Sequence, residues 1–272
     1  MSLQAKTAFI TGASRGIGKA IALRLAKEGM NIVVAAKSIA EDNRLGGTIY
    51  SAAKEIENAG GKAFPVKCDI RSEEDITMAV QLAKDAFGGI DVLINNASAI
   101  YLNNTISTEA KRFDLIHDIN VRGTFLVTKA CIPHLEKSTN PHIITLSPPL
   151  NMEMKWWKNH PAYTLSKYSM TMLALAWSEE LKGQAIASNA LWPATTIDTA
   201  AVRNLLGGEA LAKMSRKPEI VADAVFHIIS QPSSGCTGNT FIDEIVLQQA
   251  GITNLDSYAV DAGSKLYPDL FL

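Results

Sequence analysis

The chain has 272 residues, of which 47% are hydrophobic and 19% are charged. This composition supplies enough apolar side chains for a large core and too few charges for a disordered chain. Lys and Arg total 26 and Asp and Glu total 27, so the formal net charge is −1. Because no net positive field draws the chain to nucleic acid, we expect no nucleic-acid partner.

Uninterrupted apolar runs in the sequence are short. None approaches the roughly 18 residues that a membrane span requires, and residues 1–6 lack the basic and apolar regions of a secretory signal. We therefore expect no membrane span and a cytoplasmic location. Cys68, Cys131 and Cys236 lie far apart with no Cys-x-x-Cys spacing, which favours reduced, buried thiols over a disulfide framework or a metal site.

Short β-branched runs alternate along the chain with longer segments of helical spacing, such as Ile17, Ile21 and Leu25. The predicted strands are residues 7–10, 31–36, 63–67, 92–95, 142–146, 187–191 and 239–242. This alternation is typical of a parallel sheet covered on both faces. We predict one α/β domain over residues 1–272: a doubly wound, seven-stranded, mainly parallel sheet with helices on both faces and an irregular tail over residues 243–272. Ligands of such sheets bind beyond the carboxyl ends of the strands.

A glycine-rich loop follows the first predicted strand and precedes a predicted helix. Gly12 allows a tight turn, Gly16 lets the backbone approach a pyrophosphate, and Gly18 lets helix and strand pack closely. An ordinary glycine turn with a helix cap is the alternative, but the position after the first strand favours a dinucleotide site. The predicted cofactor contacts in this loop are Gly12, Ser14, Arg15, Gly16, Ile17 and Gly18.

Three motifs occur in order along the chain: Gly12-x-x-x-Gly16-x-Gly18, Asn95-Asn96-Ala97 and Tyr163-x-x-x-Lys167. Together they resemble the short-chain dehydrogenase/reductase family over nearly the whole chain. Within it, the Ser147-Pro148-Pro149-Leu150 stretch and the tail are similar to hydroxysteroid dehydrogenase-like proteins. The resemblance implies a Rossmann-type fold, an NAD(P) cofactor, oxidation or reduction at an alcohol or carbonyl carbon, and a homodimer or homotetramer.

The second predicted strand is followed by Lys37 rather than by a carboxylate. A carboxylate suits a bare ribose diol, whereas a 2′-phosphate needs cations, so Lys37 with Arg15 and Ser14 predicts NADP(H) in preference to NAD(H). The alternative is that Lys37 and Arg15 are solvated surface charges. The resemblance adds cofactor contacts from Asp69, which would bind the adenine amino group, and from Asn96, Tyr163, Lys167 and Ile197.

Tyr163 and Lys167 lie four residues apart in a predicted helix over residues 162–182, so their side chains share a face. A cation about 4 Å away, at an effective dielectric near 20, would lower the pKa of the phenol by about three pH units. The resemblance makes Tyr163 the acid/base, Lys167 its electrostatic partner and a ligand of the nicotinamide ribose, and Asn120 the support of a proton relay.

The family usually places a serine beside the substrate oxygen. Here Ser147 occupies the first of two positions that are often both serine, and Pro148 occupies the usually catalytic one. Ser147 is therefore either a catalytic contact or an ordinary strand-end hydroxyl, and a catalytically silent dinucleotide sensor or scaffold is the alternative to an enzyme.

Apolar residues are frequent in the loops predicted beyond the carboxyl ends of the strands. They predict a cleft for a lipophilic aldehyde, ketone or alcohol, or else a packed lid or subunit contact. These residues are Ile100, Tyr101, Met152, Met154, Trp156, Trp157, Trp192, Leu205 and Leu206.

Overall fold

The computed structural model describes residues 2–42 and 45–272. Its sheet has seven strands in the order β3-β2-β1-β4-β5-β6-β7, and every neighbouring pair is parallel. The predicted sheet is confirmed, and each predicted strand is correct to within one residue at either end. The strands are β1 (Thr7–Thr11), β2 (Asn31–Ala36), β3 (Lys62–Lys67), β4 (Val92–Asn95), β5 (His142–Leu146), β6 (Ala187–Trp192) and β7 (Thr240–Ile242).

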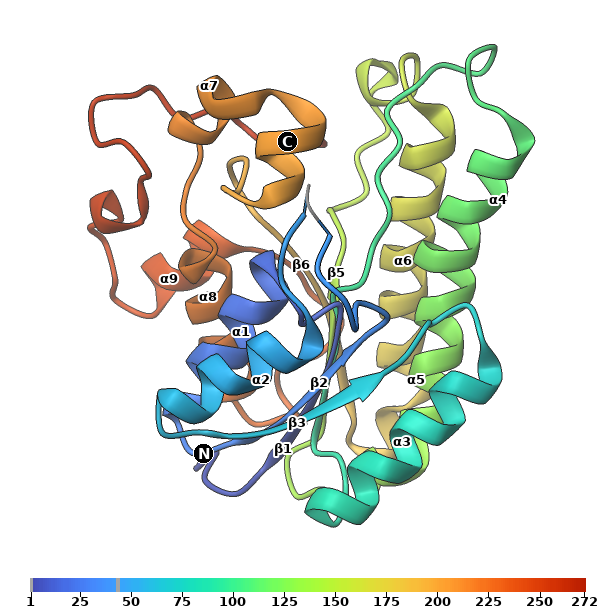
Figure 1. Cartoon of the computed structure of the whole chain (residues 1–272), viewed down its shortest axis with the longest axis vertical. Helices are drawn as coiled ribbons and strands as arrows, with labels where there is room; N and C mark the ends of the chain where they lie inside the picture. Colours follow the sequence, from blue (N-terminus) through green and yellow to red (C-terminus); the bar gives the residue numbers. More distant parts are fainter. Residues whose placement is uncertain (1, 43–44) are drawn as a thin grey trace.

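Helices cover both faces of the sheet, as Figure 1 shows. On one face lie α1 (Gly16–Lys27), α2 (Ile49–Asn58), α8 (Glu219–Ile229) and α9 (Asp243–Gln249). On the other lie α3 (Glu73–Phe87), α4 (Ala110–His117), α5 (Thr124–Leu135) and α6 (Pro161–Glu180). The strand order reverses between β1 and β4, which is where a doubly wound sheet opens a crevice for a ligand.

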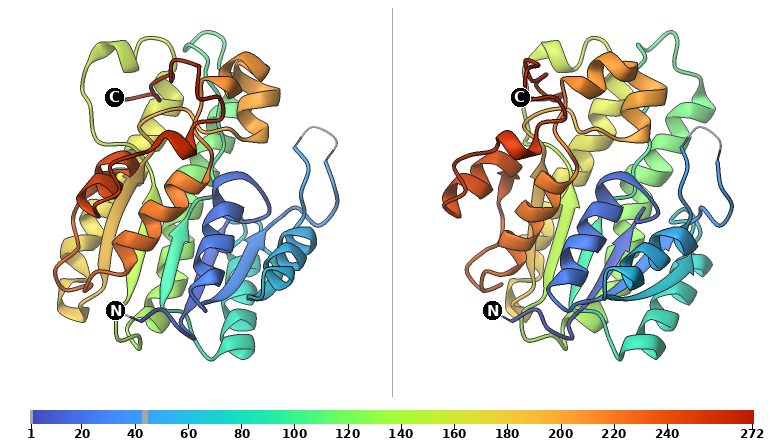
Figure 2. Two further views of the ribbon diagram at one scale, coloured as in Figure 1. Left: turned by 90° about the vertical axis from the view of Figure 1, so that its left-hand side faces the viewer. Right: turned by 60° about the vertical axis from the view of Figure 1, so that its left-hand side comes forward.

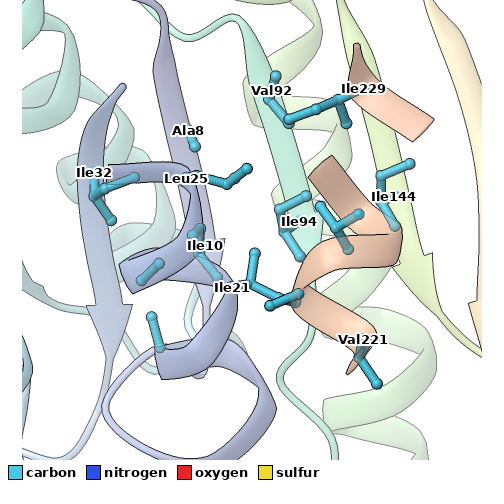
Figure 3. Packing of buried hydrophobic residues seen from close by; sticks show 14 of the residues in the cluster. Ala8, Ile10, Ile21, Leu25, Ile32, Val92, Ile94, Ile144, Val221 and Ile229 are labelled. Carbon is cyan, nitrogen blue, oxygen red and sulfur yellow. The ribbon is translucent and has the colours of Figure 1, made fainter. Parts of the chain in front are cut away.

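The helices are held by apolar stripes at helical spacing. Ile21 and Leu25 of α1 are fully buried in one core with Ile10 of β1 and Val221 of α8 (Figure 3). Residues close in the sequence also fix where a helix begins and ends. The Ser72 side chain accepts a hydrogen bond from the Asp75 N–H at the start of α3, and Gly88, at a φ of 87°, ends that helix. This rigid core fixes the loops at the carboxyl edge of the sheet.

The prediction of an irregular tail over residues 243–272 is wrong at its start, because Asp243–Gln249 form α9. The Asp243 carboxylate accepts the Glu244 N–H at 2.7 Å, and Val246 and Leu247 pack into the core. A helix of seven residues is too short for its periodicity to stand out in the sequence. Further on, α7 (Gly208–Lys213) and residues 267–272 lie together near the carboxyl edge (Figure 2).

Candidate active site

A first cavity of about 410 Å³ opens beyond the carboxyl ends of β1, β2, β3 and β4. Its walls are the loop after β1 and the residues that directly follow the other three strands. Parallel strands bring these four chain segments to one edge although they are far apart in the sequence. Of the predicted cofactor contacts, the cavity is lined by Gly12, Ser14, Arg15, Gly16, Ile17, Lys37, Asp69 and Asn96.

The glycine loop has the backbone that a nucleotide site requires. Gly12 and Gly16 have φ angles of +68° and +55°, which side chains rarely adopt. A Cβ on Gly18 would lie 2.7 Å from the Gly12 oxygen and would collide with Nδ2 of Asn96. Asn96 holds the loop, since its Nδ2 donates to the oxygens of Thr11 at 2.8 Å and Gly12 at 3.2 Å. The loop therefore leaves an open cradle of backbone at the start of α1.

Two cations and a hydroxyl gather at the end of β2. Arg15 Nη2 donates to Ser38 Oγ at 2.9 Å and to the Gly47 oxygen at 2.8 Å, and the exposed Lys37 lines the same cavity. Arg15 Nε is buried without a hydrogen-bond partner among the described residues. Burial lowers the pKa of Arg15, while the charge of Asp42 opposes that change. This corner therefore suits an anion, and the sequence did not single out Ser38.

Asp69 lies at the end of β3 on the opposite wall. Its carboxylate forms an ion pair with Arg71 at 2.5 Å, and this hydrogen bond lowers the pKa of Asp69. Ser72 is the N-cap of α3, so Asp69 does not cap this helix. Asp69 is thus an ionised acceptor that lines the first cavity.

A second cavity of about 400 Å³ adjoins the first. The two share a wall made of Ile17, Asn96, Ser98, Ile100, Thr199 and Ala201. Tyr163, Lys167 and Ile197 line the second cavity, and most of its remaining wall is apolar, from Leu102, Leu146, Trp192, Val202, Leu206 and Leu211. The glycine loop and the Tyr163–Lys167 pair therefore face adjoining parts of one edge of the sheet.

Lys167 is nearly inaccessible to solvent. It lies one helical turn after Tyr163 on α6, and its Nζ donates to the Leu146 oxygen at 2.6 Å and lies 4.9 Å from the centroid of the Trp192 ring. Burial lowers the pKa of Lys167 to about 7, and the charge of Asp269 opposes that change. The predicted sharing of a helix face is confirmed.

The expected lowering of the Tyr163 pKa is wrong for this structure. Burial raises the pKa of Tyr163 above its usual value, and the nearby charge of Asp269 raises it further. The side chain is 4% exposed, and the loss of water around the phenolate is the largest cause of the raised pKa. Tyr163 is therefore protonated at neutral pH.

Asn120 lies in a π-helical turn (Asp118–Gly123) between α4 and α5. Its Oδ1 accepts hydrogen bonds from Ser98 Oγ and the Ala99 N–H, and its Nδ2 donates to the Ala99 oxygen and to Ser166 Oγ. Asn120 is fully buried and lines neither cavity. The side chain thus ties the loop after β4 to α6, the helix that carries Tyr163.

Ser147 does not line the second cavity, although Leu146, the residue before it, does. It is fully buried, lines neither cavity, and its Oγ has no hydrogen-bond partner among the described residues. Its N–H donates to the Leu191 oxygen of β6 at 3.1 Å, so the residue directly after β5 still pairs with the neighbouring strand. The structure does not bring Ser147 to the wall that Tyr163 and Lys167 form.

The apolar residues predicted in the loops beyond the carboxyl ends of the strands divide into two groups, apart from Leu205, whose side chain lies outside what the structure describes. Ile100, Trp192 and Leu206 line the second cavity, whereas Tyr101 and the loop after β5 do not. In that loop Met152 and Met154 are exposed, Trp157 packs on Tyr168, and Trp156 packs on Phe271. Of the two alternatives that the sequence left open, a cleft wall and a packed lid, the structure supports the packed lid for the tryptophans of this loop.

The sequence missed the contribution of residues 267–272. Tyr267, Pro268, Asp269 and Leu270 line the second cavity, and Phe271, which is 1% exposed, packs on Tyr163 at a centroid distance of 6.2 Å. No local pattern signals this role, because the contacts connect positions about a hundred residues apart.

Comparison with known proteins agrees with this architecture. The family model described as short chain dehydrogenase matches residues 6–209. Hydroxysteroid dehydrogenase-like protein 2 of Xenopus laevis is 58% identical over 266 residues, which cover 98% of this chain. This chain spans only 63% of that relative's length.

Two solved structures extend the comparison. A short chain dehydrogenase from Mycobacterium thermoresistibile superposes with a TM-score of 0.94 at 50% identity, covering 100% of this chain and 96% of the other. A metagenomic short-chain oxidoreductase in complex with NADP superposes with a TM-score of 0.71 at 25% identity, covering 89% of this chain and 98% of the other. The chain belongs to the short-chain dehydrogenase family, a family of NAD(P)-dependent oxidoreductases. In the part that the structure describes, no helix is both long and apolar enough to cross a membrane.

Proposed function

We propose that this protein is an NADP-dependent oxidoreductase that interconverts a lipophilic carbonyl compound and its alcohol, with Tyr163 as the acid/base. The observation that carries the proposal is that Tyr163 and Lys167 line a cavity that adjoins the one formed by the glycine loop. The acid/base pair and the cradle for a diphosphate thus lie along one edge of the sheet, within reach of one extended ligand.

The residues of the second cavity suit proton transfer to a carbonyl oxygen. Burial raises the pKa of Tyr163, so the phenol holds its proton at neutral pH and donates it when the carbonyl is reduced. The phenolate formed in that step is stabilised by the ammonium of Lys167, which lies on the same face of α6. In the oxidative direction the phenolate takes the proton of the alcohol. A nicotinamide cofactor, when bound, supplies or accepts the hydride.

The first cavity fits a dinucleotide with a 2′-phosphate. The open backbone at Gly12 and Gly16 would receive the diphosphate, and Arg15, Lys37 and Ser38 would hold the 2′-phosphate. Asp69 would accept from the adenine amino group. The related oxidoreductase in complex with NADP supports the same choice of cofactor. A fluorescence titration with NADPH and NADH tests this preference: equal or tighter binding of NADH would refute it.

The apolar wall of the second cavity supports a lipophilic substrate. Its volume of about 400 Å³ is within the range of small-molecule sites, and such sites combine apolar walls with a few polar groups. A homodimer or homotetramer is part of the same proposal, on the resemblance to the family. The cytoplasmic location and the single-domain organisation stay predictions.

A second candidate function is a catalytically silent NADP sensor or scaffold. The position of Ser147 favours it, because a serine that lines neither cavity leaves the substrate oxygen without the usual partner. The intact Tyr163–Lys167 pair favours the enzyme. A sensor would bind NADPH and turn over none of the substrates offered.

NADPH oxidation followed by absorbance, with a panel of apolar aldehydes and ketones, separates the two functions. We expect turnover by the unchanged protein and a loss of about 10²- to 10⁴-fold in kcat for Tyr163→Phe, which removes the proton donor and keeps the ring. Ser147→Ala is the matched control and is expected to lose much less. Binding of NADPH without turnover by the unchanged protein would favour the sensor.

A further inference from the structure

Most polar side chains in the wall of the second cavity are already bound to other parts of the protein. Ser98 Oγ donates to Asn120 Oδ1 at 3.1 Å. Thr196 Oγ1 lies 2.8 Å from Ser215 Oγ, so these two hydroxyls share a hydrogen bond. Such groups have little capacity left for a ligand, and the free polar positions of the wall are therefore few.

The carboxylate of Asp269 differs from these side chains, because one of its oxygens is free. Its Oδ1 accepts the Leu270 N–H at 2.7 Å, and its side chain forms no other hydrogen bond or ion pair among the described residues. An ionised carboxylate accepts up to about four hydrogen bonds. Asp269 is half-buried and lines the cavity, so Oδ2 is an acceptor that a bound molecule can use.

The backbone of segment 267–272 fixes the place of this carboxylate. The Asp269 N–H donates to the Ala194 oxygen at 3.1 Å, and the Tyr267 oxygen accepts the Thr196 N–H at 3.0 Å. The two bonds belong to an antiparallel β-bridge with the loop after β6. Alternate side chains of an extended segment share a face, and accordingly Tyr267 and Asp269 both line the cavity.

The exposure of the wall increases from one end of the cavity to the other. Tyr163 and Lys167 are buried, whereas Leu206 and Tyr267 are exposed. The proposed acid/base pair thus lies at the closed end, and Leu206 and Tyr267 mark the opening. A ligand that extends from Tyr163 to the opening passes Asp269, which is half-buried and two residues from Tyr267.

We propose that Asp269 is a specificity residue: its carboxylate accepts a hydrogen bond from a hydroxyl group of the substrate, which is a lipophilic carbonyl compound with a separate hydroxyl. This inference rests on the proposed function, because it takes Tyr163 as the group that binds the carbonyl. The apolar wall would hold the body of the substrate. An analogue without the hydroxyl would leave the carboxylate shielded from water and unpaired, so it would bind less well.

Matched compounds that differ by one hydroxyl test the proposal. The pairs are 2-adamantanone with 5-hydroxy-2-adamantanone and decanal with 10-hydroxydecanal, and NADPH oxidation is followed at pH 8. Burial raises the pKa of Asp269 to about 7, so its carboxylate is mainly ionised at that pH. We expect the hydroxyl to raise kcat/KM about tenfold or more in at least one pair, and Asp269→Leu to abolish this preference.

Two further variants control for charge and folding. Asp269→Asn keeps an acceptor oxygen and the shape of the side chain, so it should retain part of the preference and serves where Asp269→Leu does not fold. Asp261→Leu makes the same change at an exposed position and should retain all of it. Equal kcat/KM within both pairs, or a full preference in Asp269→Leu, overturns the proposal and leaves the proposed redox function standing.

Binding separates the two proposals where no NADPH is oxidised. Trp192 lines the second cavity, so protein fluorescence follows its occupancy by the same four compounds. Tighter binding of a hydroxylated compound by the unchanged protein, lost in Asp269→Leu, supports the role of Asp269 without any turnover. Equal binding within both pairs, or binding of none of the four, overturns it.

Discussion

Phe271→Ala is expected to release segment 267–272 from the second cavity while the rest of the fold stays intact. Phe271 is 1% exposed, and its ring packs on five others, those of Trp156, His160, Tyr163, Tyr168 and Trp192. Phe271 also has a φ of +78°, a left-handed backbone that costs about 1–2 kcal/mol. Alanine keeps that cost and loses the packing, so the substitution tests the packing alone.

The expected size of the effect depends on how strongly the other contacts of segment 267–272 hold it in place. Its hydrogen bonds, such as Trp192 Nε1 to the Leu270 oxygen and Asn151 Nδ2 to the Phe271 oxygen, contribute about 0.5–1.5 kcal/mol each. Fixing the backbone of each residue costs about 1–2 kcal/mol, so these bonds alone do not hold the segment. Replacement of a buried Phe by Ala costs about 3–5 kcal/mol. Without this packing energy, the hydrogen bonds do not compensate for the cost of ordering the segment.

Hydrogen exchange measures the release directly. The amides of Tyr267 and Asp269, which donate to the oxygens of Met214 and Ala194, are expected to exchange about 100-fold faster or more, since every 1.4 kcal/mol is about tenfold. Amides of β1 and β4 should be unchanged. Leu272→Ala, at an exposed neighbour, is the control. A change of less than tenfold at both amides would show that packing of Phe271 does not hold the segment.

Three further outcomes are expected. Gly18→Ala should destabilise the fold by about 1–3 kcal/mol in thermal unfolding and weaken NADPH binding, whereas Gly89→Ala, with open space around its Cβ, should do neither. Burial raises the pKa of Asp243 to about 7 from an unfolded value of 3.8, so its protonated form favours folding and that contribution is lost as pH rises between these values. Asp243→Asn lacks this loss, so the unfolding free energy of the variant relative to the unchanged protein should increase by about 3 kcal/mol between pH 4.5 and 8; a constant difference contradicts the assignment. Lys37→Ala should weaken NADPH binding about tenfold and leave NADH binding unchanged, and equal losses for both cofactors would place Lys37 away from the 2′-phosphate.

Local sequence patterns were sufficient to predict the sheet and the residues that line the first cavity. Strands buried on both faces appear as continuous β-branched runs, and the glycines after β1 reveal a turn whose backbone excludes side chains. The four-residue spacing of Tyr163 and Lys167 likewise fixes one helix face. Each of these features depends on residues close together in the chain, and the order of a parallel sheet then brings the loops to one edge.

Only the tertiary structure decided the protonation of Tyr163 and the part of the second cavity's wall that comes from segment 267–272. Whether Ser147 faces the cavity depends on how the chain leaves β5, and whether Tyr163 holds its proton depends on how completely the surrounding side chains exclude water. Asp269 and Phe271 reach the site only because the chain returns to it about a hundred residues after α6 begins. Burial and long-range contact are properties of the packed molecule, so no spacing within the sequence encodes them.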